Sequence, residues 1–289
     1  MGNLTRHTDR KGQVATFIYD ALNRRTDSTH LDSSMSVTYD AVGRLTQTTD
    51  TLGGSVEHTY DVLDRLIGQT GVLGTVSYQY DTVGRRTAMT AAGQALVGYA
   101  WDPGSRLTQL AQGSQVVTFQ YDNASRRTRL TLPNQVSTEY QYDSASRLTA
   151  LIYRNATSQL GDLTYTYDPA GNRTGIGGTF ARTLLPDPVA MATYDAANRQ
   201  LTFGSETLTY DANGNLTSDQ ATTYIWDARN RLVGMTGPTM AAFQYDALGR
   251  RAQKMLNGST TRFLYDRLNP ILEVPDNGLA AALLTGLNL

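Results

Sequence analysis

The sequence has no cysteine and only three histidines among its 289 residues. The absence of cysteine excludes a disulfide scaffold, a cysteine-ligated zinc site and a thiol nucleophile. The histidines His7, His30 and His58 leave little material for metal binding or histidine-based catalysis. The polar N-terminus shows no signal peptide, and the longest apolar run, LAAALL at 279–284, is far too short to span a bilayer. We therefore expect no metal site, no cofactor and no membrane span.

Lysine and glutamate are also nearly missing, with two and four residues. These are the usual residues of helix surfaces, whereas the 40 threonines and 17 tyrosines favour strands. Of the 25 basic residues 23 are arginine, and the formal net charge is −1. The composition predicts a chain that is mostly β.

A dipeptide of an aromatic residue and aspartate recurs thirteen times, at spacings of 16 to 27 residues and most often 20 or 21. An internal repeat of this period indicates a protein built from tandem copies of one structural unit. The aromatic residues are Tyr19, Tyr39, Tyr60, Tyr80, Trp101, Tyr121, Tyr142, Tyr167, Tyr194, Tyr210, Trp226, Tyr245 and Tyr265. The aspartates are Asp20, Asp40, Asp61, Asp81, Asp102, Asp122, Asp143, Asp168, Asp195, Asp211, Asp227, Asp246 and Asp266.

Two further positions belong to the repeat. Ten copies carry arginine four residues after the aspartate: Arg24, Arg44, Arg65, Arg85, Arg106, Arg126, Arg147, Arg199, Arg231 and Arg250. The position three residues after the aspartate is always Gly, Asn, Asp or Ser, types that tolerate a left-handed backbone. A three-residue hairpin loop needs that conformation at its last position. We predict a hairpin turn in each copy, with positive φ at Asn23, Gly43, Gly84, Gly171, Gly214 and Gly249.

The residues before each turn alternate between apolar and polar types, as in Val76, Tyr78 and Tyr80, which places the apolar side chains on one face of a strand. The repeated residues have a structural interpretation. We expect the motif aromatics, for example Tyr80, Trp101, Tyr121 and Tyr142, to be largely buried and stacked along the sheet. The aspartate can accept N–H groups of the turn, and its charge can pair with the arginine four residues on or with one from an adjacent repeat.

Thirteen hairpins supply about 26 strands, which at about 4.8 Å per strand would make one sheet about 125 Å wide. Open sheets rarely exceed about ten strands without curling or splitting, and a closed roll of this width is too large to be filled by side chains. The sheet is therefore expected to be hollow, spiral or flattened into layers. A propeller is excluded, because its blades recur every 40–45 residues.

The segments YDAVGRLTQTTD (39–50), YDANGNLTSD (210–219), WDARNRLVG (226–234) and YDALGRRAQK (245–254) resemble the repeat of YD-repeat proteins. These are the bacterial Rhs proteins, the wrapping components of insecticidal toxin complexes, and the teneurins. The resemblance covers essentially the whole chain. It implies an all-β fold in which tandem hairpins form a curved antiparallel sheet that spirals into part of a hollow shell.

The resemblance also implies a function and partners. A complete shell of this kind would enclose a C-terminal toxin domain, and this chain would be a structural wall of the shell, upstream of an Rhs-associated core. The full-length protein would be secreted or exported to the cell surface. We expect a single domain, 1–289, with regular repeats at 1–149, irregular repeats at 150–192 and short repeats at 193–289. The insertions at 150–162 and 175–190 are expected to be loops on an interacting face or a strand displaced at a corner.

Other functions have weaker support in the sequence. Exposed aromatic rows would instead favour a carbohydrate-binding or cell-surface-binding module, which remains the alternative. An enzyme is not expected, since Glu57, Glu139, Glu206 and Glu273 show no local pairing of the kind a glycosidase requires. The segment 211–222 lacks the glycine and glutamate of a calcium loop. Nucleic-acid binding is not expected either, because aspartate balances the arginine and the pI is near 6.3.

Overall fold

The computed structural model describes residues 2–182 and 191–283, and these residues form 29 β-strands joined by turns. None of the described residues lies in a helix, so none forms a helix long and apolar enough to cross a membrane. Every strand pairing in this part of the chain is antiparallel, as between β2 (Val14–Tyr19) and β3 (Arg25–Thr29). The prediction of an all-β fold built from tandem antiparallel hairpins is confirmed.

The chain packs as two compact units. Unit 1 comprises residues 1–77 together with 187–289, and unit 2 comprises residues 78–186. Regular repeats are found in both units. The single domain 1–289 and its division into regular, irregular and short repeats both stay predictions.

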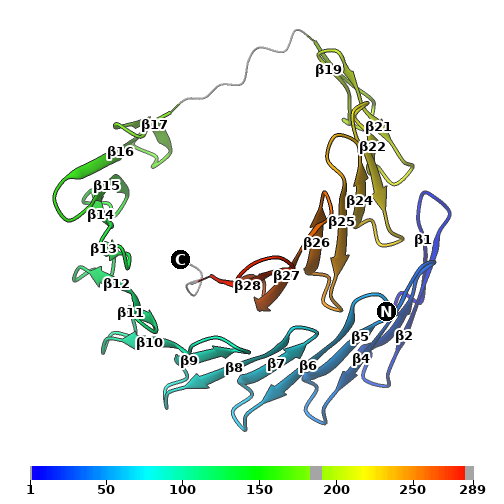
Figure 1. Ribbon diagram of the computed structural model, residues 1–289, viewed down its shortest axis with the longest axis horizontal. Coiled ribbons are helices and arrows are strands. Elements are labelled where there is room, and N and C mark those ends of the chain that lie inside the picture. Colours follow the sequence, from blue (N-terminus) through cyan, green and yellow to red (C-terminus); the bar gives the residue numbers. More distant parts are fainter. Residues whose placement is uncertain (1, 183–190, 284–289) are drawn as a thin grey trace. The chain divides into compact units, whose positions relative to one another are not determined.

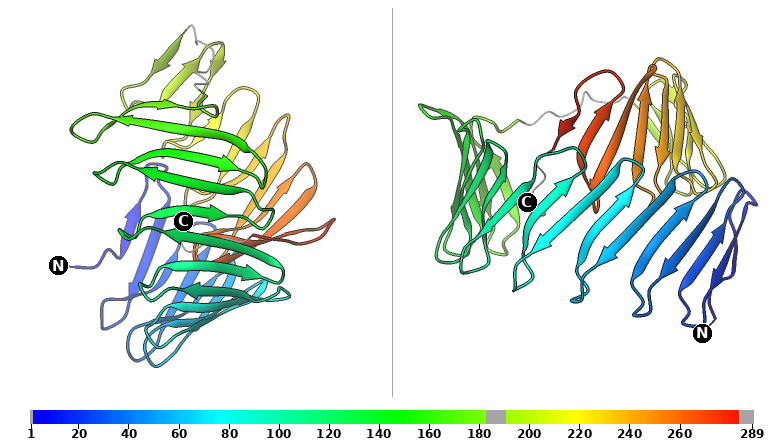
Figure 2. Two further views of the ribbon diagram at one scale, coloured as in Figure 1. Left: turned by 90° about the vertical axis from the view of Figure 1, so that its left-hand side faces the viewer. Right: turned by 60° about the horizontal axis from the view of Figure 1, so that its bottom comes forward.

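The N-terminal sheet of unit 1 contains strands that each pair with the next in the chain (Figure 2, right). After β1 (Arg6–Thr8), β2 and β3 come β4 (Ser34–Tyr39), β5 (Leu45–Asp50), β6 (Gly54–Tyr60), β7 (Leu66–Gly71) and β8 (Gly74–Tyr80), which crosses the boundary to unit 2. The motif turns join β2 to β3, β4 to β5 and β6 to β7, and shorter loops join the opposite strand ends.

The C-terminal part of unit 1 forms two further sheets (Figure 1). The first contains β18 (Ala192–Tyr194), β19 (Gln200–Phe203) and β20 (Glu206–Thr207). The second contains β21 (Thr209–Tyr210), β22 (Leu216–Ser218), β23 (Thr223–Trp226), β24 (Leu232–Thr236), β25 (Ala241–Tyr245), β26 (Arg251–Leu256), β27 (Ser259–Asp266), β28 (Asn269–Pro275) and β29 (Ala281–Ala282). We call this nine-stranded sheet the C-terminal sheet.

Unit 2 repeats the same hairpin pattern. Its strands are β9 (Arg86–Ala91), β10 (Val97–Trp101), β11 (Leu107–Gln112), β12 (Gln115–Tyr121), β13 (Arg127–Thr131), β14 (Ser137–Tyr142), β15 (Leu148–Arg154), β16 (Gln159–Tyr167) and β17 (Arg173–Gly177).

The two insertions have different outcomes. The extra residues of 150–162 lengthen the β15–β16 hairpin, whose strands have seven and nine residues, and are neither a long loop nor a displaced strand. In the insertion at 175–190, Phe180 folds back, its ring 5.5 Å from that of Tyr153. Residues 183–190, including the Pro-Asp-Pro segment, lie outside the described residues, so the expectation for this insertion remains open.

The motif aromatics and the residues two and four positions before them share one face of each sheet, which we call the aromatic face. The buried side chains of this face are mostly those two and four positions before the motif residue. Val56 and Val76 of unit 1 are 2% and 0% exposed, and Tyr99 and Phe119 of unit 2 are 6% and 3% exposed. Because side chains alternate along a strand, the residues one and three positions before the motif aromatic, such as Gln120 and Thr118 of β12, project from the opposite face.

Candidate functional site

The repeated turn has one geometry in the first twelve copies. In the first copy, the Asp20 N–H donates to the Arg24 carbonyl at 2.9 Å, and the Asn23 N–H donates to the Asp20 carbonyl at 3.0 Å. Asn23 has φ of 58°, the left-handed conformation that closes a three-residue loop. All six residues for which we predicted positive φ have it: Asn23, Gly43, Gly84, Gly171, Gly214 and Gly249. The turn prediction is confirmed.

The thirteenth copy departs from this geometry. Asp266 pairs directly with Asn269, so the turn has two residues, and Arg267 rather than Asn269 has positive φ. Pro270 occupies the arginine position of this copy, and it lacks both the N–H group and the side-chain donor that the other turns use.

The motif aspartate is the centre of each turn. Asp40 Oδ1 accepts hydrogen bonds from the N–H groups of Val42 and Arg44, at 3.1 and 2.8 Å. Its Oδ2 pairs with Arg44 Nε at 2.6 Å. Of the two partners left open by the sequence, the aspartate pairs with the arginine four residues on, and it does so in all ten copies that have one. Asn172 and Asn215 replace that arginine in two copies and still donate to the aspartate, each at 2.9 Å.

These contacts stabilise the ionised carboxylate. The N–H of Arg147 and then its guanidinium lower the pKa of Asp143 below its ordinary value of 3.8. The pKa of Asp40 is also lowered: desolvation raises it, but the hydrogen bonds from Arg44 outweigh that effect. The aspartate is therefore held as a charged turn residue, which is the wrong protonation state for a general acid.

The same arginine also connects one repeat to the next. Arg106 Nη1 donates to the carbonyl of Asp122, in the following copy, at 2.9 Å. Its guanidinium lies over the ring of Tyr121, 5.2 Å from the centroid. Cation–π contacts of this kind, from the arginine of one copy to the aromatic ring of the next, recur in both units.

The motif aromatics are anchored by their polar atoms. The Tyr121 hydroxyl donates to the carbonyl of Leu107 at 2.8 Å, and Trp101 Nε1 donates to that of Arg86 at 2.8 Å. With these two included, at least eleven of the thirteen aromatics make such a bond to the preceding repeat. Each of these aromatics therefore ties its own copy to the backbone of the copy before it.

The prediction that these rings are largely buried holds only in part. Tyr80, Trp101, Tyr121 and Tyr142 are half-buried, and Tyr194 is 57% exposed. The reason is their place at the strand end beside the turn, where an arginine covers one side of the ring and the other parts reach solvent. The deeply buried aromatic position lies two residues earlier in the strand.

A second row of arginines was missed in the sequence. The residue after the motif arginine is itself arginine in several copies, and it covers the buried aromatic of the preceding strand. Arg86 lies over Tyr78 at 4.4 Å, and Arg251 lies over Phe243 at 4.5 Å. The signal was the Arg-Arg doublet in these copies, which the sequence shows as plainly as the motif itself.

A joint within unit 1 brings the turns of the C-terminal sheet against the N-terminal sheet (Figure 1). Arg229, two residues after the motif aspartate of the eleventh copy, forms an ion pair with Asp50 at the end of β5. The Asp50 side chain is 1% exposed and that of Arg229 is 15% exposed. Burial raises the pKa of Asp50, but Arg229 and the N–H groups of Leu52 and Gly53 outweigh it, so the net pKa is lowered.

The turn of the twelfth copy occupies the next position along the joint. With its amide oxygen turned toward Arg250, Gln69 accepts hydrogen bonds from both terminal guanidinium nitrogens, at 2.8 and 2.9 Å. Gly53 lies directly against the turn, because a Cβ at Gly53 would be 2.5 Å from the carbonyl oxygen of Tyr245. Only glycine therefore allows this approach of the two backbones.

The tenth copy completes the joint. Asn213 Nδ2 donates to Asp9 Oδ2 at 2.7 Å, and Lys11 pairs with Asp211 at 3.3 Å. The joint therefore sets three consecutive turns of the C-terminal sheet against consecutive segments of the N-terminal sheet. Its residues are about 180–200 positions apart in the chain, so the local repeat pattern did not identify it.

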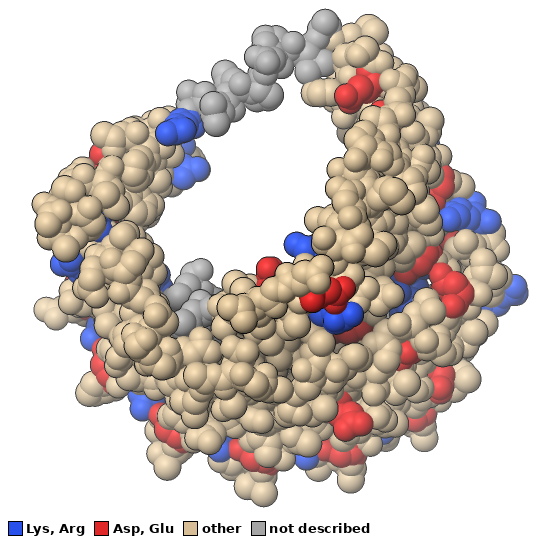
Figure 3. Space-filling model, in the orientation of Figure 1, with Lys and Arg blue, Asp and Glu red and all other residues tan. Residues whose placement is uncertain are grey.

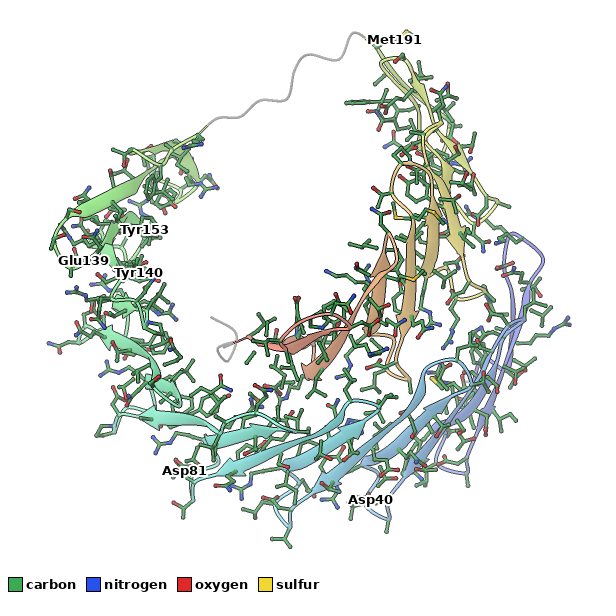
Figure 4. All side chains as sticks on the ribbon, viewed as in Figure 1. Asp40, Asp81, Glu139, Tyr140, Tyr153 and Met191 are labelled. Carbon is green, nitrogen blue, oxygen red and sulfur yellow. The ribbon has the colours of Figure 1, made fainter. Side chains whose placement is uncertain are left out.

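Acidic and basic side chains elsewhere also pair with each other. Glu139 lies 3.1 Å from Arg154 and 3.9 Å from Arg129, on the sheet face opposite Tyr140 and Tyr153 (Figure 4). Both charge signs are interspersed over the visible surface (Figure 3). Within residues 2–182 and 191–283, no three histidine, aspartate or glutamate side chains gather as a metal site would require.

Comparison with known families gives two matches. The teneurin YD-shell family matches residues 116–273, and the RHS repeat family matches residues 2–33, 39–76 and 60–96. Together these matches cover both units and include copies of the turn described above.

Among curated proteins, the tRNA nuclease WapA of Bacillus subtilis (strain 168) is 35% identical over 111 residues, 36% of this chain and 4% of that protein. The tRNA3(Ser)-specific nuclease WapA of Bacillus spizizenii shows the same identity and coverage. The chain thus spans about 4% of the length of these curated relatives.

Among solved structures, the complex TcdB2-TccC3 matches with a TM-score of 0.60 at 17% identity, over 97% of this chain and 22% of that chain. The Tc holotoxin pore of Photorhabdus luminescens, with a TccC3 variant, matches with a TM-score of 0.59 at 16% identity, over 97% of this chain and 21% of that one. These likenesses show a shared fold.

Proposed function

The chain belongs to the teneurin YD-shell family, and we propose that it is a non-catalytic wall of a shell that encloses a toxin domain. The proposal extends to the whole polypeptide, in which the enclosed domain would follow the repeats. The full-length protein would be secreted or exported, since its contents would act on another cell.

The observation that carries the proposal is the use of the motif residues. The aspartate, the arginine and the aromatic residue of the motif hold neighbouring repeats together. Arg106, for example, contacts Asp102, the Asp122 carbonyl and Tyr121. A sheet in which each repeat is tied to the next in this way resists separation of its strands, and a wall requires that resistance. Motif aspartates such as Asp40 and Asp143, held by N–H groups of the turn and by an arginine, are suited to structure rather than to proton transfer.

The alternative of a carbohydrate-binding module is not favoured. Aromatic sugar-binding platforms need a free ring face, but here an arginine lies over the ring and the hydroxyl donates to the backbone, as at Tyr121. All thirteen motif aromatics lie within the described residues, and Tyr194 is the one among them that is exposed. A single exposed ring is no repeated binding surface.

Enclosure is tested by proteolysis of the natural reading frame that contains this chain. We expect the domain after the repeats to resist proteinase K, and to be digested when the joint is broken by Arg229→Ala together with Arg250→Ala. The matched control is Leu22→Ala, an exposed turn position outside the joint, which should leave the protection unchanged. Equal digestion of the wild type and the joint variant, or a reading frame with no domain after the repeats, would contradict enclosure.

The absence of catalysis is tested on the chain itself. Because the curated relatives are named tRNA nucleases, purified chain is incubated with total tRNA, with and without Mg²⁺. We expect intact tRNA. Cleavage that is abolished by a single substitution in the described residues would show that the chain is an enzyme.

A further inference from the structure

Three turns of the N-terminal sheet present aliphatic side chains to solvent at the same motif position. Leu22, Val42 and Leu63 each lie two residues after a motif aspartate, and they are 69%, 72% and 64% exposed. Single exposed aliphatic residues are ordinary. A row of them, one per hairpin along one edge of a sheet, presents an apolar side chain at regular intervals. We call these turns, 21–23, 41–43 and 62–64, the turn edge.

An almost identical turn is covered in the joint. The twelfth copy reads YDALGR (245–250), and the first copy reads YDALNR (19–24). Leu248 of the twelfth copy is 39% exposed, against 69% for the equivalent Leu22. The alanine before it shows a larger difference, since Ala247 is 4% exposed and Ala21 is exposed. Of two nearly identical turns, that of the twelfth copy is thus packed against another sheet and that of the first copy is exposed to solvent.

The seat of the twelfth copy shows what such a turn binds. Its Ala247 and Leu248 border a space of about 380 Å³ together with Met35, Val37 and Thr48 on the aromatic face of β4 and β5. The turn backbone lies on a glycine of the β5–β6 loop. A seat for a YD turn is therefore the loop end of another YD sheet, with apolar side chains and a glycine that lets the backbones approach.

We propose that the turn edge is an interaction surface for a second copy of this chain, which seats it on the loop end of its own C-terminal sheet. That loop end carries Met240 and Leu256, which are 60% and 40% exposed. It also carries Gly258, where an added Cβ would have nothing within 4 Å. Both the aliphatic side chains and the accessible glycine of the known seat are thus present and open.

The spacing of the two edges supports the same partner. One turn occurs for every two strands, so at about 4.8 Å per strand the turns repeat about every 10 Å. Loops of the C-terminal sheet repeat at the same interval for the same reason. The contact joins two different edges, so it is head-to-tail and leaves a free edge at each end of the pair, which allows further copies to add. The inference rests on the joint and holds whether or not a toxin domain is enclosed.

Cross-linking tests the contact directly, because the chain has no cysteine of its own. A Val42→Cys variant is mixed with a Leu256→Cys variant under mild oxidation, and we expect a disulfide-linked dimer that contains one of each. The matched control replaces Val42→Cys with Ile18→Cys, which is 60% exposed but lies on the sheet face opposite the aromatic face. A cross-link that forms equally well from Ile18→Cys would overturn the proposal.

Light scattering over a hundredfold range of concentration gives an independent test. We expect the mass of the wild type to rise with concentration, while Leu22→Lys with Val42→Lys stays monomeric and Ile18→Lys behaves as the wild type. Far-UV circular dichroism checks that each variant is folded. A wild type that is monomeric at every concentration would refute the second copy as the occupant. Association that survives the lysine substitutions would overturn the proposal too, and would assign the contact to unpaired strand edges instead.

Discussion

Replacement of Arg229 by alanine would leave a carboxylate buried without its cation. The Asp50 side chain is 1% exposed, and Arg229 Nη1 is its charged partner. Removing one member of a buried ion pair typically costs about 3–5 kcal/mol of unfolding free energy. Asp50 would keep hydrogen bonds from the N–H groups of Leu52 and Gly53, at 2.8 and 3.1 Å. We therefore expect Arg229→Ala to fall at the lower end, about 3 kcal/mol.

The loss of unfolding free energy in Arg229→Ala should become smaller as the pH falls. In the wild type the net pKa of Asp50 is lowered, so its contribution to stability is present above the unfolded pKa of about 3.9 and is lost as the pH falls below it. Without Arg229, burial is opposed by two N–H groups alone, and the pKa rises. The stability difference between wild type and variant should therefore shrink as the pH is lowered from 7 toward 4, because a protonated Asp50 is easier to bury.

The assay follows unit 1 by fluorescence. The chain has two tryptophans, Trp101 in unit 2 and Trp226 in unit 1, so urea unfolding in a Trp101→Phe background reports on Trp226 alone. Leu22→Ala, at the same motif position as Arg229, is the control and should change stability by less than about 0.5 kcal/mol. A loss below about 1 kcal/mol in Arg229→Ala would refute the reasoning. So would a double variant with Asp50→Ala whose loss equals the sum of the single losses, since coupled residues are not additive.

Three other outcomes are expected. Gly84→Val should lower the free energy of unfolding by about 1–3 kcal/mol. Gly84 has φ of 87° and open space around its Cβ position, so the loss is backbone strain alone. Thermal unfolding should show a smaller loss for Gly84→Asn, and equal losses would contradict this account. Tyr121→Phe should cost about 1 kcal/mol in urea unfolding, because it removes the hydroxyl that donates to the Leu107 carbonyl, and an unchanged midpoint would argue against that bond. Burial and then Arg250 lower the pKa of His58, so the unfolded chain takes up the proton first. The stability of the protein should therefore fall as the pH drops below about 6.5. His58→Gln should lose less stability than the wild type between pH 7.5 and 5.5, and identical pH profiles would exclude His58 as the cause.

The local part of the structure was predictable because it is repeated. A single Gly or Asn at the third turn position is weak evidence, but its recurrence predicts the hairpin, its left-handed residue and its register, and twelve of the thirteen copies have them. In ten copies that turn brings an arginine within reach of the aspartate four residues before it. The sequence left the choice between this arginine and one from an adjacent repeat open, and the geometry resolves it, since the arginine uses Nε for its own aspartate and Nη1 for the next copy.

The burial of the motif aromatics was not predictable from alternation alone. Period two assigns Phe119 and Tyr121 to one face without saying how deep each lies, and Phe119 is the deeper of the two. Depth along a strand depends on what packs over it, and near the turn that is the arginine of the preceding copy rather than another sheet.

By itself, the sequence determined the strand-turn-strand unit and the turn geometry of the first twelve copies, because both depend on residues at most a few positions apart. It left open which arginine each aspartate pairs with. It did not determine which turns lie against another sheet. The turns of the first and twelfth copies are almost the same in sequence, yet Ala21 is exposed and the equivalent Ala247 is 4% exposed. Tertiary structure decides between them, because the joint needs Asp50, Gln69 and Gly53 to face turns from the far end of the chain, and contacts of that separation are set by the packing of whole sheets rather than by any local pattern.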